Sequence, residues 1–213
     1  MLADLLPPEV VVRESCIANV SGHMFPEEET CVKAAVPKRR QEFLAGRCCA
    51  REALRNLGIA PVSLPCNSDR TPVWPGNIVG SITHSTHHCA AAVALNSQFA
   101  SIGIDLEEVS SFDQKLLRLI CTEREWSVLS VRPAPEQKTL GTLLFSAKES
   151  VYKCQYPLTG QWLGFRSVEI DFDLEAGEFQ AWLPSNFSGV GRYCSGRCAS
   201  RDGLVATAIT FRK

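Results

Sequence analysis

The sequence lacks a strong excess of charge, a long apolar run and a basic leader segment. Lysine and arginine number 22 against 23 aspartate and glutamate residues, a formal net charge of −1. This balance excludes a general polyanion-binding surface, so we expect no nucleic-acid partner, and any phosphate site must come from local clustering. No stretch approaches the roughly 20 apolar residues that cross a bilayer, so we expect no membrane span. Residues 1–9 lack a basic start and contain Pro7 and Pro8, which predicts no secretory signal and a cytoplasmic location.

The ten cysteines also lack the spacing of a metal or disulfide framework. Cys48 and Cys49 are adjacent inside a helical pattern, and the chain contains no CxxC pair. Cys194 and Cys198 form a close pair with a gap, but no second Cys or His pair accompanies them, which disfavours structural zinc. We therefore expect most of these thiols to be small buried apolar residues in a reducing compartment.

Two amphipathic helices dominate the hydrophobic pattern. Residues 38–57 place apolar side chains on one side, and Gly58 follows as a C-terminal stop. Residues 136–155 carry apolar side chains at i, i+3, i+4 and i+7, and Pro157 is expected to end that helix. A third helix is predicted over residues 112–130.

Segments rich in β-branched residues, bounded by turn residues, predict strands around these helices. The predicted strands cover residues 9–20, 79–83, 90–95, 101–106, 167–172, 178–183, 192–199 and 204–211. Each half of the chain then holds one strong helix and several strands, so we expect an α/β (α+β) fold with subdomains 1–100 and 101–213. A length of 213 residues with 45% hydrophobic content suffices for two small cores.

Two acids stand at the end of the strand predicted over residues 101–106. Asp105 and Glu107 lie two residues apart, and side chains at i and i+2 share one face of a strand. Two carboxylates on one face repel each other unless a cation lies between them. Mg²⁺ typically takes one or two carboxylates and completes its shell with phosphate and water. The alternative is a solvated acidic strand end.

The helix predicted over residues 136–155 carries a second charged group. Glu149 and Lys153 are i and i+4 and share a face, and Lys148 also lies off the leucine stripe. One interpretation is a surface ion pair, which contributes little to stability. The other is a carboxylate for a metal or a proton, with two ammonium groups for phosphates.

Arginines and histidines supply candidate anion ligands. Arg40, Arg47 and Arg51 recur at spacings of seven and four on the first helix, and Arg70 lies in a proline-rich loop. Guanidinium groups suit bidentate phosphate contacts, although a solvated helix face is the plain alternative. His84 stands at a predicted strand end between hydroxyl residues, where it suits either a phosphate contact or a structural role.

Two more histidines, His87 and His88, follow His84 within four residues. Three histidines this close raise the question of a transition metal. No carboxylate stands nearby in the sequence, and Cys89 is the one adjacent thiol. Zinc is therefore the minor interpretation of this segment.

Taken together, these segments resemble the 4′-phosphopantetheinyl transferase superfamily, and in particular the bacterial group that includes enterobactin synthase component D. The likeness rests on the order and spacing of several short motifs. They lie at residues 38–51, 70–75, 80–85, 103–107, 145–153 and 157–165. Each motif alone is weak, but the ordered set is specific.

The resemblance implies a fold and an activity. The implied fold is a pseudo-twofold pair of similar subdomains, each a long helix packed on a small, mostly antiparallel sheet. The implied reaction transfers the 4′-phosphopantetheine moiety of coenzyme A to a serine hydroxyl of an apo acyl or peptidyl carrier protein and releases 3′,5′-ADP. The implied cofactor is Mg²⁺, with Mn²⁺ as a substitute, and the implied enzyme is a monomer.

The resemblance also implies roles for individual residues. Asp105, Glu107 and Glu149 would hold the metal on the pyrophosphate of coenzyme A. Glu149 would take the serine proton, kept ionised by Lys153 and the metal. The remaining residues would bind coenzyme A: the 3′-phosphate and adenosine by Arg40, Arg47 and Arg70, a phosphate by His84, and the pyrophosphate by Lys148 and Lys153.

Two other functions fit parts of the pattern. A catalytically silent coenzyme A or nucleotide-binding module would keep the arginines and lose the acids, whereas all three acids are present here. A Mg²⁺-dependent nucleotide phosphohydrolase would attack with water and need no protein acceptor. For a transferase, the carrier would dock near residues 112–132, including Lys115, Leu116, Leu117 and Arg118. Fatty-acid, polyketide and peptide-synthetase carriers all fit the sequence equally well.

Overall fold

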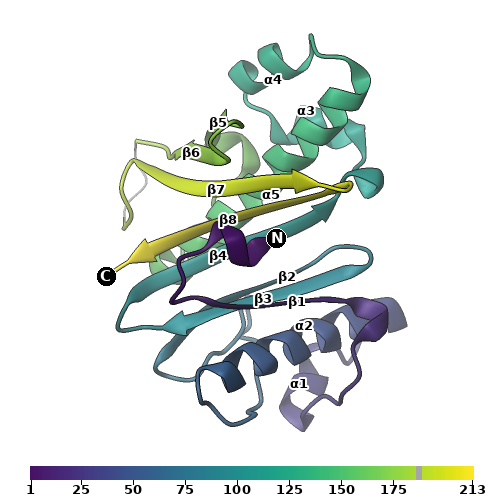
Figure 1. Ribbon diagram of the computed structural model, residues 1–213, viewed down its shortest axis with the longest axis vertical. Helices are drawn as coiled ribbons and strands as arrows, with labels where there is room; N and C mark the ends of the chain where they lie inside the picture. Colours follow the sequence, from purple (N-terminus) through teal and green to yellow (C-terminus); the bar gives the residue numbers. More distant parts are fainter. Residues whose placement is uncertain (186–188) are drawn as a thin grey trace.

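Two antiparallel sheets lie side by side, each with a long helix on one face (Figure 1). The computed structural model describes residues 1–185 and 189–213. The first sheet has the order β1 (Val11–Cys16), β3 (His88–Leu95), β2 (Ile78–His84). The second sheet has the order β4 (Phe99–Glu108), β8 (Leu204–Arg212), β7 (Tyr193–Arg201), β6 (Glu178–Trp182), β5 (Glu169–Asp173). The mixed α/β class predicted from the sequence is confirmed.

The helices divide between the two sheets. The α-helices are α1 (Pro26–Cys31), α2 (Pro37–Asn56), α3 (Leu117–Ile120), α4 (Glu123–Leu129) and α5 (Ala134–Thr159). Short 3₁₀ turns are η1 (Leu2–Leu5), η2 (Ile17–Asn19), η3 (Val109–Ser111), η4 (Gln114–Leu116) and η5 (Phe165–Ser167). Helix α2 packs on the β1-β3-β2 sheet, and we call this pair the first lobe. Helix α5 packs on β4 and β8, and we call that larger sheet with its helix the second lobe.

Helix α2 confirms the helix predicted over residues 38–57, to within a residue at each end. Small buried side chains, among them Ala50 and Ala53, let it lie close against β3. Gly58 then adopts a φ of +78°, the left-handed conformation that ends a helix most easily without a Cβ.

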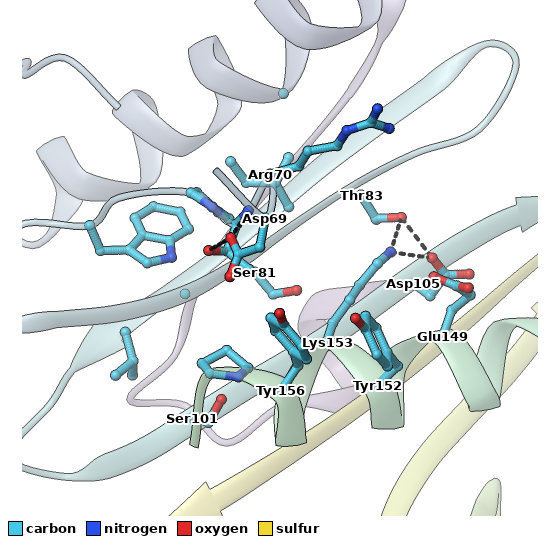
Figure 2. Close-up of a pocket in the computed structure, with 18 of the residues that line it drawn as sticks. Asp69, Arg70, Ser81, Thr83, Ser101, Asp105, Glu149, Tyr152, Lys153 and Tyr156 are labelled. Carbon is cyan, nitrogen blue, oxygen red and sulfur yellow. Dashed lines mark hydrogen bonds and ion pairs between the residues drawn. The ribbon is translucent and has the colours of Figure 1, made fainter. Parts of the chain in front are cut away.

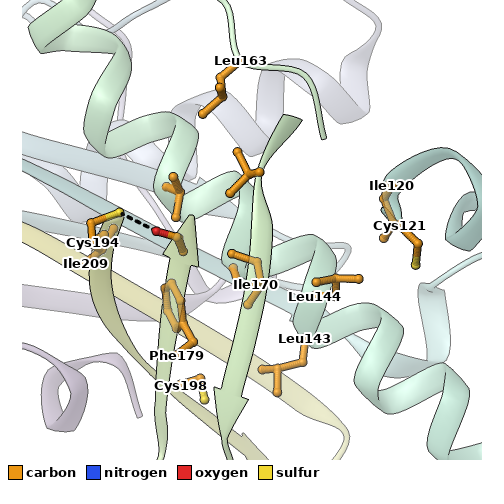
Figure 3. Close-up of a cluster of buried hydrophobic side chains, with 14 of the residues drawn as sticks. Ile120, Cys121, Leu143, Leu144, Leu163, Ile170, Phe179, Cys194, Cys198 and Ile209 are labelled. Carbon is orange, nitrogen blue, oxygen red and sulfur yellow. Dashed lines mark hydrogen bonds between the residues drawn. The ribbon is translucent and has the colours of Figure 1, made fainter. Parts of the chain in front are cut away.

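Helix α5 is longer than the sequence predicts. Its leucine stripe packs against Ile170 and Phe179 of the second sheet (Figure 3). The expectation that Pro157 ends the helix is wrong, because α5 continues to Thr159 and is capped by Gly160 at φ +62°. Proline in the last turn removes a single backbone hydrogen bond, so the helix can pass through it before the glycine stop.

The helix predicted over residues 112–130 is broken into η4, α3 and α4. Thr122 begins a new helix because its hydroxyl accepts from the Glu125 N–H at 3.2 Å, while the Glu125 carboxylate accepts from the Thr122 N–H at 2.7 Å. This reciprocal cap starts α4 at the expense of a continuous helix. Cys121, just before it, is extended.

Strand β4 lies directly against α5 at Gly103. A Cβ added to Gly103 would lie 1.9 Å from the backbone oxygen of Ser150 and 2.8 Å from the Cys154 side chain. Only glycine permits this approach. The contact therefore fixes how closely the acids of β4 lie to the charged side chains of α5.

Cysteine usage follows the sequence prediction with one exception. Six of the thiols are buried: Cys49, Cys89, Cys121, Cys154, Cys194 and Cys198. The exception is a disulfide between Cys31 at the end of α1 and Cys66 in the loop before β2. The two cysteines lie 35 residues apart, so their spacing alone does not indicate the pairing. Among the described residues, no helix combines the length and apolar character needed to cross a membrane.

Candidate functional site

The two lobes meet where β2 and β4 lie side by side in separate sheets. Side chains join these strands. Ser81 and Thr83 of β2, and Ser85 directly after it, alternate along the chain and direct their side chains toward β4. All three hydroxyl residues are buried, and we call them the hydroxyl seam. Ser81 Oγ accepts from the Ile104 N–H at 3.2 Å, and Thr83 Oγ1 donates to Asp105 Oδ1 at 2.9 Å.

The third hydroxyl of the seam meets Glu108, a buried acid that the sequence reasoning missed. Ser85 Oγ donates to Glu108 Oε1 at 2.8 Å. His87 Nδ1 lies 2.8 Å from Glu108 Oε2, and His88 Nδ1 lies 3.4 Å from Oε1. Burial opposes ionisation, but these hydrogen bonds outweigh it and lower the pKa of Glu108 to about 2. His87 and His88 thus anchor the β2–β3 turn through Glu108.

A cleft of about 880 Å³ opens between the lobes above the seam. It is lined by residues of α2, the loop before β2, strands β2 and β4, and α5 (Figure 2). The cleft brings together seven of the nine predicted site residues: Arg47, Arg70, His84, Asp105, Glu107, Glu149 and Lys153. Its acidic end lies at β4 and α5, and its basic end lies at α2 and the loop.

Asp105 is the centre of the acidic end and is only 2% exposed. Its Oδ1 accepts from Lys153 Nζ at 2.6 Å and from Thr83 Oγ1 at 2.9 Å (Figure 2). Its Oδ2 is buried and has no hydrogen-bond partner among the described residues. A buried carboxylate oxygen left unsatisfied is costly, so this atom is a ready ligand for a cation.

The three acids of the cleft influence one another electrostatically. Burial, reinforced by Asp105, raises the pKa of Glu107 to about 8. Burial also raises the pKa of Glu149, with Asp105 adding to the rise and Lys153 opposing it. Burial would lower the pKa of Lys153, but Asp105 and Glu149 outweigh it and raise the pKa. Three acids therefore share one ammonium, and their mutual repulsion favours bound protons that a cation would displace.

A ready-made three-carboxylate cage is absent. Within residues 1–185 and 189–213, no three His, Cys, Asp or Glu side chains are arranged to hold a metal. The sequence had suggested an ion pair between Lys153 and Glu149, but Lys153 pairs with Asp105 instead. Mg²⁺ needs only one or two protein carboxylates when phosphate and water complete its shell. The free Oδ2 of Asp105 and the crowding of three acids around one ammonium fit such an ion.

Arg47 and Arg70 form the basic end. Arg47 is 5% exposed, its Nε donates to the Leu64 carbonyl at 2.6 Å, and its guanidinium lies 4.2 Å from the centroid of the Phe43 ring. Burial lowers the pKa of Arg47 to about 10, so it remains charged at neutral pH. Arg70 is exposed and adopts a φ of +70°, a conformation that non-glycine residues rarely hold.

Arg40 does not reach the cleft, which corrects the sequence prediction. Its guanidinium contacts the Glu29 carboxylate and donates to the Val32 carbonyl at 3.0 Å, so α1 draws it away. Arg39 lines the cleft in its place and contacts His84. The seven-residue spacing to Arg47 had favoured Arg40 over its neighbour.

His84 lines the cleft beside Arg39 of α2. Burial and the neighbouring Arg39 guanidinium lower its pKa, while Glu42, whose Oε2 lies 3.8 Å from His84 Nδ1, opposes the change. The ring is therefore predominantly neutral near pH 7. A neutral imidazole can donate one hydrogen bond to a phosphate oxygen without adding charge.

Lys148 also lies outside the cleft, so its predicted contact with a pyrophosphate is wrong. Its ammonium is buried and donates to Glu125 Oε2 at 2.6 Å, the Ile120 carbonyl at 2.7 Å and the Phe165 carbonyl at 2.9 Å. These three contacts match the three N–H donors of an ammonium group. Lys148 therefore ties α5 to the neighbouring segments of its own lobe, one residue before Glu149.

The segment expected to dock a partner is partly buried. Leu117 is 2% exposed and belongs to the core, so it is unsuited to docking. Lys115 and Arg118 are exposed, and Leu116 is partly buried. Leu119, which the sequence reasoning did not name, is 67% exposed.

Comparison with known proteins places both lobes in one family. Residues 27–94 match the 4′-phosphopantetheinyl transferase N-terminal domain, and residues 101–207 match the 4′-phosphopantetheinyl transferase superfamily. The chain is 43% identical to the 4′-phosphopantetheinyl transferase Svp of Streptomyces mobaraensis, over 98% of this chain and 88% of the relative. It is 36% identical to the 4′-phosphopantetheinyl transferase Npt of Nocardia iowensis, over 99% and 100%.

Other likenesses cover less of the molecule. Enterobactin synthase component D of Escherichia coli (strain K12) is 36% identical over 54% of this chain and 54% of its own length. Among solved structures, the holo-ACP-synthase of Plasmodium yoelii has 17% identity and a TM-score of 0.42, over 54% of this chain and 94% of that one. Svp and Npt match nearly the whole chain, whereas enterobactin synthase component D matches about half of it. The chain belongs to the 4′-phosphopantetheinyl transferase superfamily.

Proposed function

We propose that the cleft between the lobes binds coenzyme A and transfers its 4′-phosphopantetheine moiety to a serine hydroxyl of an apo acyl or peptidyl carrier protein, with Mg²⁺ as cofactor. The transferase activity accords with the family and with relatives such as Svp and Npt. The observation that carries the residue assignment is the arrangement of one cleft with guanidinium groups at one end and three acids with Lys153 at the other. A diphosphate between a nucleoside 3′-phosphate and a reacting centre suits that arrangement.

The basic end would bind the nucleotide part of coenzyme A. Arg39, Arg47 and Arg70 all line it, and guanidinium groups form bidentate contacts with phosphate. Arg47 is the best oriented, because the Leu64 carbonyl and the Phe43 ring hold it in place. We assign the 3′-phosphate to this group and replace Arg40 by Arg39 in the assignment.

The acidic end would hold the diphosphate and its metal. Asp105, through its free Oδ2, would be the principal protein ligand, with Glu107 and Glu149 as the further acids. When bound, Mg²⁺ neutralises charge on the phosphoryl oxygens. Lys153 adds a positive charge from α5, and His84 donates a hydrogen bond to a phosphate oxygen.

The chemical step is a phosphoryl transfer. The serine oxygen bonds to the β-phosphorus of coenzyme A, the bond from that phosphorus to the oxygen of 3′,5′-ADP breaks, and the serine proton goes to Glu149. Burial raises the pKa of Glu149, which makes it a better proton acceptor than an exposed carboxylate. Positioning and electrostatic stabilisation supply most of the acceleration in such reactions.

The carrier protein needs access to the acidic end. Exposed Leu119 and Val131, together with exposed Arg118 next to Leu119 in the chain, supply apolar and basic side chains on the surface of the second lobe. We propose this surface as the docking site for an acidic carrier helix. We also propose that the enzyme works as a monomer, because one chain supplies both ends of the cleft.

The decisive test is incubation with an apo carrier protein, coenzyme A and Mg²⁺, followed by intact-mass measurement. The transferase adds one phosphopantetheine to the carrier and releases one 3′,5′-ADP. Release of nucleotide products without a carrier would instead identify a phosphohydrolase. Coenzyme A binding with neither outcome would identify a silent binding module. Several apo carriers tested side by side would define which class of carrier is served.

A further inference from the structure

Thr83 stands where the two lobes and the acidic end of the cleft meet. It belongs to β2 in the first lobe and is 3% exposed. Its hydroxyl donates to Asp105 Oδ1 at 2.9 Å and accepts from Lys153 Nζ at 3.2 Å. Lys153 also donates to Asp105 Oδ1 at 2.6 Å, so the three side chains form a closed triangle (Figure 2).

This triangle distinguishes the two oxygens of Asp105. Oδ1 accepts two hydrogen bonds, one from each lobe, whereas Oδ2 is buried and has no partner in the part of the chain that the structure describes. The terminal torsion of an aspartate is otherwise broad, and its two oxygens are chemically equivalent. The donors to Oδ1 therefore decide which oxygen stays free for a further ligand and in which direction it lies.

We propose that Thr83 is a positioning residue for the metal site. Its hydroxyl, acting from the first lobe, fixes the carboxylate of Asp105 so that Oδ2 is presented to a hard divalent cation. The inference rests on the proposed function, which places that cation at Asp105. It adds that the first lobe helps to form the cation site without contributing a ligand.

The contacts of Thr83 and Lys153 are not equivalent. Lys153 brings charge, and its ammonium can exchange Asp105 for a phosphate oxygen when a substrate enters. A threonine hydroxyl is neutral, buried and held on a β-strand, so it can keep its bond to Oδ1 throughout. Groups that orient a ligand in this way typically change metal affinity by about 10–100-fold when they are removed.

The seam supplies a matched control for this idea. Ser85 also joins the lobes by a buried hydroxyl, but its partner is Glu108 rather than Asp105. If Thr83 served only to hold the lobes together, loss of the Ser85 hydroxyl would weaken cation binding as much as loss of the Thr83 hydroxyl. A positioning role predicts that only the Thr83 change matters.

The test is a titration with Mn²⁺, with the free ion followed by electron paramagnetic resonance, on the protein alone and with coenzyme A. Thr83→Val keeps the shape and removes the hydroxyl, and we expect its dissociation constant for Mn²⁺ to rise about tenfold or more. Thr83→Ser retains the hydroxyl and Ser85→Ala leaves Asp105 untouched, so both should stay close to wild type. The Mg²⁺ concentration for half-maximal transfer should shift in the same order.

Three results would overturn the inference: wild-type affinity in Thr83→Val, an equal loss in Thr83→Ser, or an equal loss in Ser85→Ala. Thr83→Ala, which adds no atoms, is the second variant should valine prevent folding, and circular dichroism checks each fold. If the wild-type protein transfers phosphopantetheine but binds no Mn²⁺, the proposed metal site itself is wrong. If it transfers nothing, the proposed function is wrong, and these failures are distinguishable from the first three.

Discussion

Helices α2 and α5 both bring charge to the cleft, but they hold it differently. On α2, Arg47 is buried and bound to a carbonyl of its own lobe, so its positive charge is fixed before any ligand arrives. On α5, Lys153 offsets three acids, and two of these, Glu107 and Glu149, have raised pKa values. The first lobe thus supplies a preorganised positive charge for the proposed anion site, whereas the second supplies acids for the proposed cation site. Binding and chemistry should therefore respond to different mutations.

The largest expected effect comes from removing the proposed base on α5, which should lower catalysis without lowering coenzyme A binding. We expect Glu149→Gln to lower kcat by about 10²–10⁴-fold, the usual contribution of a general base, while coenzyme A binding persists. Carrier phosphopantetheinylation by intact mass and coenzyme A binding by calorimetry measure the two effects. Glu136→Gln, at an exposed position of the same helix, is the control. Full activity in Glu149→Gln would exclude the residue as base.

The closeness of β4 and α5 gives the next largest effect. Gly103→Ala would place a Cβ 1.9 Å from the Ser150 backbone oxygen, so we expect the free energy of unfolding to fall by about 1–3 kcal/mol or more. Urea denaturation measures the change. Gly76→Ala, where a Cβ meets nothing within 4 Å, should be nearly neutral. A stable, fully active Gly103→Ala variant would show that this contact does not set the site geometry.

On the α2 side, the effect should fall on substrate binding. We expect Arg47→Ala to raise the KM for coenzyme A by about tenfold or more, the scale of a lost hydrogen bond to a charged group, with a smaller change in kcat. Arg40→Ala should leave KM unchanged, because Arg40 turns toward α1. Steady-state kinetics on both variants test this. The opposite ranking would restore Arg40 to the binding site.

The smallest expected effect concerns stability and pH. The pKa of Glu107 is raised from 4.5 to about 8, so the folded protein binds more protons than the unfolded chain between these values. The stability of the metal-free protein should therefore fall as the pH rises through that window. We expect Glu107→Gln to remove part of this fall and to melt a few degrees higher at pH 9. Thermal melts from pH 5 to 9 in a chelating buffer test this, and identical pH profiles would contradict it.

The sequence predicted local features well. The two-residue spacing of Asp105 and Glu107 placed both acids on the cleft, and the leucine stripe of α5 located the helix that carries Glu149. The sequence did not predict which of two adjacent side chains points into the cleft. Arg40 was favoured over Arg39 because of its spacing to Arg47, yet Glu29, eleven residues away, decides the matter.

Most of the features that the sequence failed to predict are contacts between distant segments of the chain. The family resemblance assigned Lys148 to the pyrophosphate, whereas Glu125 of another helix binds it. The alternate hydroxyls of residues 81–85 were visible in the sequence, but their partners lie more than 20 residues away in the other lobe. The Cys31–Cys66 disulfide escaped the spacing argument for the same reason.

The hydroxyl seam also bears on solubility. Strands β2 and β4 are each the outermost strand of their sheet, and unpaired strand edges are templates for intermolecular pairing. By lying against each other they hide two such edges within one molecule. An enzyme that opens its lobes too widely would expose both at once, so a variant lacking the Thr83 and Ser85 hydroxyls together should self-associate on mild heating, which light scattering would reveal.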